Sequence, residues 1–136
     1  MEQMIYGLVS AVVSEALNAA GFDRFNEGAP PPNLATQQGP FALVDIPVDK
    51  VTTLALGPGA PLRYEGAVEI GLFVKEGAGQ AAIRAAKQEL TKRLINVYIG
   101  DVLMGHQALA MGTRKLAQWQ GVGFQYLFSA DQLVVP

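Results

Sequence analysis

The chain has 136 residues, half of them hydrophobic, which is enough apolar material for one globular domain with its own core. Only 16% of the residues are charged and the formal net charge is -2, so a broad basic face for nucleic-acid phosphates is not expected. Cysteine is absent, which excludes disulfides, thiolate nucleophiles and cysteine-based zinc sites. We therefore predict a single domain over residues 1–136, with a sparsely charged surface that suits contacts with other subunits.

The first segment of the chain has the pattern of an amphipathic helix. Apolar residues recur at spacings of three and four between Met4 and Leu17, and Gly21 is placed to end the helix. The segment has no basic start, and Glu2 and Glu15 interrupt it, so it does not read as a signal peptide. No uncharged apolar run reaches the about 18 residues needed to cross a bilayer. We expect a soluble protein that is intracellular when made.

Residues 23–40, DRFNEGAPPPNLATQQGP, lose this periodicity. Consecutive prolines impose extended geometry, and the rest of the segment offers little to bury. We predict an exposed arm or loop at about 23–40, and irregular segments of that length are usually functional or disordered. Pro31, Pro32 and Leu34 are therefore candidates for contacts with a neighbouring subunit or partner.

Three strands are predicted next, at about 41–46, 51–56 and 62–75, with prolines and glycines between them. The third run alternates, so that one side is apolar and forms part of the core. The other side carries the charged residues, namely Arg63, Glu65, Glu69 and Lys75. Such an ionic face is often merely solvated, but in an oligomer it can contact a neighbouring subunit, and we take these four residues as interface candidates.

Residues 77–82, GAGQAA, match the G-x-G-x-x-A fingerprint of dinucleotide-binding proteins. Two features argue against a nucleotide here. The preceding strand alternates, whereas the first strand of a parallel βαβ unit is usually apolar on both faces, and Glu76 would repel a pyrophosphate. We predict instead a strand-to-helix turn in which Ala81 and Ala82 let the next helix approach the sheet closely. Nucleotide binding by this loop remains the less favoured alternative, and no cofactor is expected.

Beyond this turn, apolar spacing from Ile83 to Leu94 predicts a second helix, with Gly100 as its end. Residues 106–117 and 119–130 predict two long strands, and Arg114 and Lys115 form an adjacent basic pair, also taken as interface candidates. The order is helix, three strands, helix, two strands. It predicts an α+β fold, mainly an antiparallel sheet of about five strands covered on one face by two helices.

Residues suited to catalysis are scarce. His106 is the only histidine, so neither a two-histidine metal site nor a catalytic triad with spare partners can be built. The serines Ser10, Ser14 and Ser129 lie outside any G-x-S-x-G elbow. We predict no catalytic residue, no metal site and no small-molecule substrate, and a small ligand-binding or enzyme domain is the alternative class of protein.

The combined pattern resembles the tail terminator, or tail completion, proteins of long-tailed bacteriophages. The resemblance lies mainly in residues 62–94, in an R-x-x-G strand start at Arg63, an FV-x-x-G-x-G turn from Phe73, and an alanine-rich helix. GPFALVDIPV at 39–48 and the aromatic-rich final strand agree in order and character. The interface candidates named above are inferred from this sequence and are not carried over from the family.

The resemblance implies a hexameric ring that caps the last ring of tail-tube protein, stops its polymerisation and presents a joining surface to the head-side connector or stopper. Proteins of that family are not enzymes, so the resemblance also implies a chain without enzymatic activity. It implies a place in the virion at the tail-neck junction, reached by assembly in the host cytoplasm. DNA would pass through the ring lumen without sequence-specific contacts, and no membrane is involved. Another head-to-tail joining protein, a stopper or an adaptor, is the alternative within this class.

Overall fold

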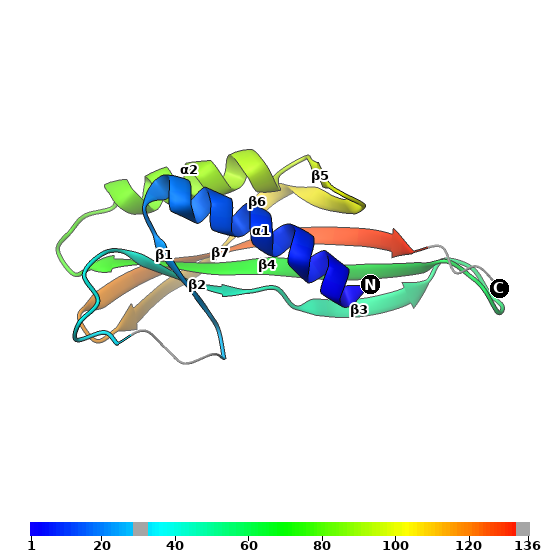
Figure 1. The fold of residues 1–136 in the computed structure, drawn as a ribbon, viewed down its shortest axis with the longest axis horizontal. Coiled ribbons are helices and arrows are strands. Elements are labelled where there is room, and N and C mark those ends of the chain that lie inside the picture. The colour runs from blue at the N-terminus through cyan, green and yellow to red at the C-terminus, as the bar shows by residue number, and fades with distance from the viewer. Residues whose placement is uncertain (29–32, 133–136) are drawn as a thin grey trace.

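The computed structural model describes residues 1–28 and 33–132, and these form two helices and a curled, mostly antiparallel sheet (Figure 1). The elements in chain order are α1 (Glu2–Ala20), β1 (Asp23–Asn26), β2 (Phe41–Asp45), β3 (Val48–Thr53), β4 (Leu62–Lys75), α2 (Ala81–Leu94), β5 (Tyr98–Ile99), β6 (Val102–Leu116) and β7 (Trp119–Gln132). The α+β class predicted from the sequence is confirmed.

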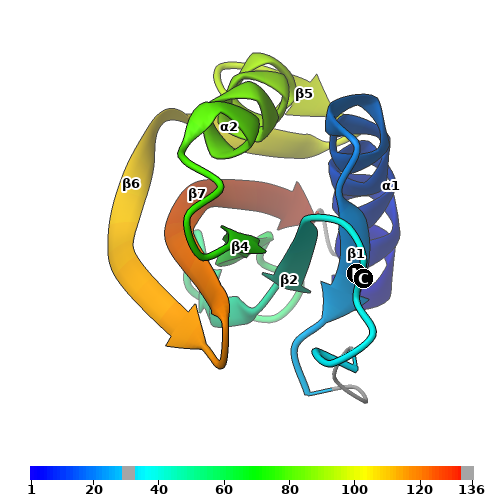
Figure 2. The same ribbon diagram turned by 90° about the vertical axis from the view of Figure 1, so that its left-hand side faces the viewer.

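Both helices form where apolar residues repeat with helical spacing. In α1 the buried residues are Ile5, Val9, Val13, Ala16 and Leu17, and in α2 they are Ile83, Ala86, Leu90 and Leu94. The left-handed Gly21, with φ of 78°, ends α1 as predicted. The helices pack against each other and lie on the same side of the sheet, as Figure 2 shows.

The sheet has the strand order β1-β2-β4-β7-β6-β5, with β3 paired to β4 as well. Strand β7 runs along the whole of β4, while β2 and β3 pair with different ends of it. Every neighbouring pair is antiparallel except β1 with β2. The long β6–β7 hairpin curls strongly and gives the sheet its rounded outline in Figure 2.

The strand count of about five is wrong, since the described residues contain seven strands. The added strand β1 lies within the range predicted to be an arm. It pairs with β2, and Arg24 donates hydrogen bonds to the Ser10 carbonyl oxygen at 2.9 Å and to Ser14 Oγ at 2.7 Å, which join β1 to α1. The other added strand, β5, has only two residues, which is too short for a periodic pattern to detect.

Two predicted boundaries also differ from the structure. Helix α2 ends at Leu94 and not near Gly100, because Ile95 is extended and Asn96 has a positive φ of 53°. The partly buried Ile95 and Val97 then pack against the core as extended chain, and Gly100 turns β5 into β6 instead. Strand β3 begins directly after Pro47, because residues 54–61 are needed for the loop at the tip of the β3–β4 hairpin.

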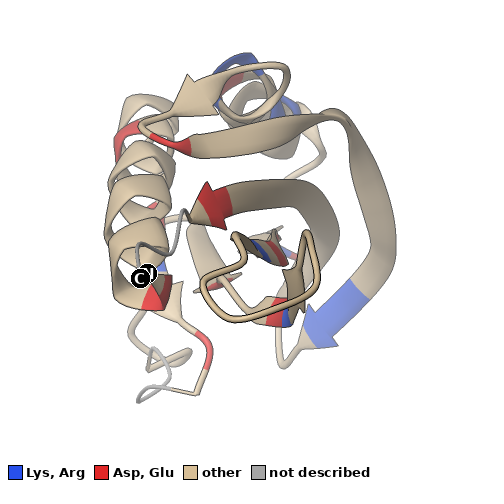
Figure 3. Ribbon diagram, turned by 90° about the vertical axis from the view of Figure 1, so that its right-hand side faces the viewer, with Lys and Arg blue, Asp and Glu red and all other residues tan. Residues whose placement is uncertain are grey.

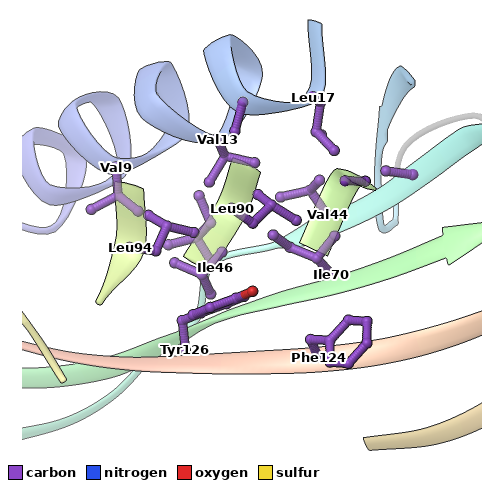
Figure 4. Close-up of a cluster of buried hydrophobic side chains, with 14 of the residues drawn as sticks. Val9, Val13, Leu17, Val44, Ile46, Ile70, Leu90, Leu94, Phe124 and Tyr126 are labelled. Atoms are coloured by element: carbon purple, nitrogen blue, oxygen red, sulfur yellow. The ribbon is translucent and has the colours of Figure 1, made fainter. Parts of the chain in front are cut away.

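The main core lies between the helices and one face of the sheet. In Figure 4, side chains of α1 and α2, among them Val13 and Leu90, point toward Ile70 of β4 and Tyr126 of β7. Tyr126 is fully buried, and its hydroxyl oxygen lies 3.2 Å from Thr91 Oγ1. Burial raises the pKa of this phenol.

A second apolar cluster lies on the opposite face of the sheet. It consists of Phe41, Leu43, Phe73 and Trp119, and Phe25, Leu34 and Leu116 pack against it. The rings of Phe41 and Phe73 are stacked with centroids 5.0 Å apart. The predicted charged face of β4 is therefore wrong at its carboxyl end, where Phe73 is fully buried under residues from β2, β7 and the 33–40 segment.

The glycine-rich turn after β4 contains Gly77 and Gly79, with φ values of 87° and 81°. A Cβ built on either glycine meets nothing within 4 Å, and Ala81 and Ala82 are exposed. The predicted close approach of helix and sheet at this loop is therefore wrong, and what requires glycine is the positive φ. The strand after α2 pairs antiparallel with β6, so the described residues around this loop form no parallel βαβ unit.

Candidate assembly interface

The β3–β4 hairpin projects from one end of the molecule, at the right of Figure 1. No charged residue lies between Lys50 and Arg63, and exposed apolar side chains cover this stretch. Leu56 is 100% exposed, Val51 46% and Leu54 45%. The backbone N–H of Leu54 donates to the Pro61 carbonyl oxygen at 2.9 Å, which closes the loop. The closed loop therefore presents exposed apolar side chains at this end of the molecule, which makes it a candidate contact surface.

Further exposed apolar residues lie at the same end. They come from the start of α1, from β5 and from the start of β6, and are Met4, Tyr98 and Leu103. Tyr98 is 71% exposed. The three line a hollow of about 550 Å³ together with Met1 and with Arg63 and Asp131 at its polar edge. Figure 3 views the molecule from this end, and most of the ribbon in view is tan, which marks residues without a charged side chain.

Arg63 and Glu65, two of the predicted interface residues, lie at the base of this hairpin. The guanidinium of Arg63 forms an ion pair with Asp131 of β7, with an Nε–Oδ1 distance of 2.7 Å. The pair raises the pKa of Arg63 and lowers that of Asp131. Glu65 is opposite Lys50 in the β3–β4 register and lines an open groove of about 590 Å³, whose apolar wall includes Leu103 and Leu127.

Glu69 lies further along the same face of β4, in an acidic patch that we define as Glu27, Asp45, Asp49 and Glu69. It is directly opposite Asp45 in the β2–β4 register. Partial burial raises the pKa of Glu69, and the negative charges of the other three carboxylates raise it further. Glu27, Asp45 and Glu69 line a hollow of about 310 Å³ with Gly71, Gly112 and Gly123, and Arg114 at its edge donates to Glu27 Oε1 at 2.7 Å.

The other predicted residues gather around the second apolar cluster at the opposite end. Lys75 Nζ lies 5.8 Å from the centroid of the Trp119 ring, and the Arg114 guanidinium lies 5.7 Å from that of Phe73. Lys115 Nζ is 3.1 Å from Glu76 Oε1. Leu34 packs on the cluster, and its carbonyl oxygen accepts a long hydrogen bond of 3.4 Å from Trp119 Nε1. Pro31 and Pro32 lie outside the described residues.

The predicted residues therefore fall into separate groups, one at each end of β4 with Glu69 between them, and do not form one surface. The sequence reasoning missed the leucines of the β3–β4 hairpin. The signal was present, since VTTLALGPGAPL is an uncharged run between Lys50 and Arg63 with glycine and proline at its centre. Such a run can be a buried strand or an exposed tip, and only the pairing of β3 with β4 distinguishes these.

Within residues 1–28 and 33–132, no group of three or more histidine, aspartate or glutamate side chains is arranged to hold a metal ion. His106 is exposed at the rim of the groove that Glu65 lines. In this same part of the chain, no helix has the length and apolar character required to cross a membrane.

The sequence matches no family model and no curated protein. Among solved structures, a protein of no stated function has a TM-score of 0.63 and 14% identity, covering 100% of this chain and 99% of that chain. A chain from the virion of a native gene transfer agent (GTA) particle has a TM-score of 0.52 and 18% identity, covering 90% of this chain and 93% of that chain. At such identities, the comparisons show a shared fold over almost the whole chain.

Proposed function

We propose that the chain is a structural protein of a phage-like virion and acts there as a tail terminator. The observation that carries the proposal is the shared fold with a chain of a GTA virion particle, over 90% of this chain. The resemblance of residues 62–94 to phage tail terminators supports the finer assignment. The chain would form a homo-oligomeric ring, most simply a hexamer, that caps the tail tube, stops its polymerisation and joins the tube to the head connector at the tail-neck junction.

The two ends of the subunit suit this role because a terminator ring needs two different faces. One end carries the apolar β3–β4 hairpin with Leu54 and Leu56, and the other carries Leu34 and the basic residues Lys75 and Lys115. A subunit with unlike ends can bind tube protein on one side only, so that growth stops where the ring binds. The task is geometric, and we propose no enzymatic activity for this chain.

The test is to add purified chain to polymerising tail-tube protein and to measure tube lengths and tube ends by electron microscopy. We expect shorter tubes with a ring of extra density at one end. Tubes that elongate unchanged, with no chain bound, would contradict the proposal. A stopper or adaptor would bind the connector and leave tube length unchanged, so connector binding is measured in parallel. A rise in unfolding temperature on adding NAD or a nucleotide would favour the nucleotide-binding alternative instead.

A further inference from the structure

The outward face of α2 is basic. Arg84, Lys87 and Lys92 are exposed around it, and none takes part in an ion pair within the described chain. Lys87 Nζ also lies 4.8 Å from the centroid of the Phe124 ring. Arg93, by contrast, is neutralised by Glu89 and Glu15. We call Arg84, Lys87 and Lys92 the basic stripe.

The acidic patch lies on the opposite face of the sheet. Val44 and Ile70 belong to the core beneath the helices, so their strand neighbours Asp45 and Glu69 point the other way. Of the four carboxylates in the patch, only that of Glu27 has an ion-pair partner in the described chain. Partial burial is the largest cause of the raised pKa of Glu69, and repulsion from the other three carboxylates of the patch raises it further. A cation from outside the subunit would relieve this repulsion.

We propose that the basic stripe on α2 of one copy docks on the acidic patch of the next copy. The inference rests on the proposed function, which requires a ring, and it names the contact that builds the ring. The hollow of about 310 Å³ that Glu27, Asp45 and Glu69 line has room for a further long cationic side chain beside Arg114, because three glycines form part of its wall. The exposed Met111 at the same hollow supplies an apolar contact.

Charge also sets the symmetry of this contact. A two-fold contact through either face alone would place acid on acid or base on base, which is repulsive. Joining unlike faces is attractive and leaves the joined pair with one free basic face and one free acidic face, so that copies can add until a ring closes. A second copy of this chain is therefore the occupant that fits both surfaces at once.

Two charge-reversed proteins test the contact. One carries Arg84→Glu, Lys87→Glu and Lys92→Glu, and the other carries Asp45→Lys and Asp49→Lys. All five positions are exposed, so we expect both variants to fold. Self-association is measured by sedimentation velocity at low and high salt. A protein with Glu2→Lys and Asp101→Lys is the control, because it has the same charge change as the Asp45→Lys and Asp49→Lys protein but outside the patch.

We expect wild-type association to weaken with salt and each variant alone to lose about a hundredfold or more in association constant. An equimolar mixture of the two variants restores complementary faces at every contact, so it should assemble again into particles that alternate the two. The control variant should associate like wild type.

Several results would overturn the inference. These are a wild type that stays monomeric at low salt, variants that associate as wild type does, and a mixture of folded variants that does not assemble. The outcome is separable from the proposed function. Tube capping that survives both sets of reversals would remove this contact and leave the terminator assignment in place. Assembly of the mixture without any capping of tubes would support this contact and contradict the terminator assignment.

Discussion

Arg63 and Asp131 are paired side by side across β4 and β7, with Nε–Oδ1 and Nη2–Oδ2 distances of 2.7 and 2.9 Å. The fork of the guanidinium meets both carboxylate oxygens, so the two hydrogen bonds fix the orientation of both groups. The pair joins the end of β7 to the base of the β3–β4 hairpin, the element that we assign to partner contact.

This pair predicts a stability loss in acid. Asp131 has a lowered pKa in the folded chain, so its contribution is present above the pKa of the unfolded chain and is lost as pH falls through the lower, folded value. Asp131→Asn should flatten this part of the pH dependence of the free energy of unfolding, measured by urea titration at several pH values. Because the pair is exposed, the effect should also shrink in high salt. An unchanged pH profile would contradict the assignment.

Glu69 predicts a change of stability with pH that is opposite in sign to that of Asp131. Its pKa is raised in the fold, so its ionisation destabilises the subunit, and stability falls as pH rises through the folded value. Glu69→Gln should therefore increase the free energy of unfolding at neutral pH, by less than about 1 kcal/mol since the side chain stays partly solvated. The gain should vanish in acid, where wild-type Glu69 is protonated. Thermal unfolding of dilute protein at two pH values measures this, and a loss of stability at neutral pH would contradict it.

Phe73 tests the second apolar cluster. It is fully buried and stacked on Phe41, so Phe73→Ala should cost about 3–5 kcal/mol in free energy of unfolding, measured by denaturant titration. Lys75→Ala is the matched control, two residues along on the same strand face and exposed, and it should change stability by about 0.5 kcal/mol or less. Equal, small effects of the two changes would mean that this face of β4 is solvated, as simple alternation suggests.

The contrast between the buried Phe73 and the exposed Lys75 shows how far the sequence predicts this fold. The bounds of β4, 62–75, follow from local alternation, and the faces of both helices follow from their spacing, so each was predictable. The burial of Phe73 was not predictable from the sequence, because it requires Trp119 and Leu34, which are distant in the chain, to pack onto the same face of β4. The acidic patch likewise forms only when β2 pairs with β4 in the register that sets Asp45 against Glu69.

Substitutions at the tip of the β3–β4 hairpin should change partner binding with little change in the stability of the subunit. Leu54→Ser with Leu56→Ser should leave the free energy of unfolding within about 1 kcal/mol of wild type, because Leu56 is fully exposed and Leu54 is 45% exposed. The same double variant should lose its effect on tail-tube length, if the hairpin end meets the tube, or its binding to connector, if it meets the head. Tyr6→Gln, which removes an exposed aromatic from α1, is the control and should retain both activities. A double variant active in both assays would exclude the hairpin as a contact.

The GAGQAA turn offers a test that distinguishes strain from crowding. Gly79 has a φ of 81° and open space around a built Cβ, so the cost of a side chain there comes from the backbone conformation. Gly79→Ala should lower the free energy of unfolding by about 1–2 kcal/mol, and Gly79→Leu by nearly the same amount, because the space around the Cβ is open. Denaturant titration of both variants makes the comparison. If the turn existed to bring α2 close to the sheet, leucine would be far worse than alanine, and that result would restore the packing explanation over the conformational one.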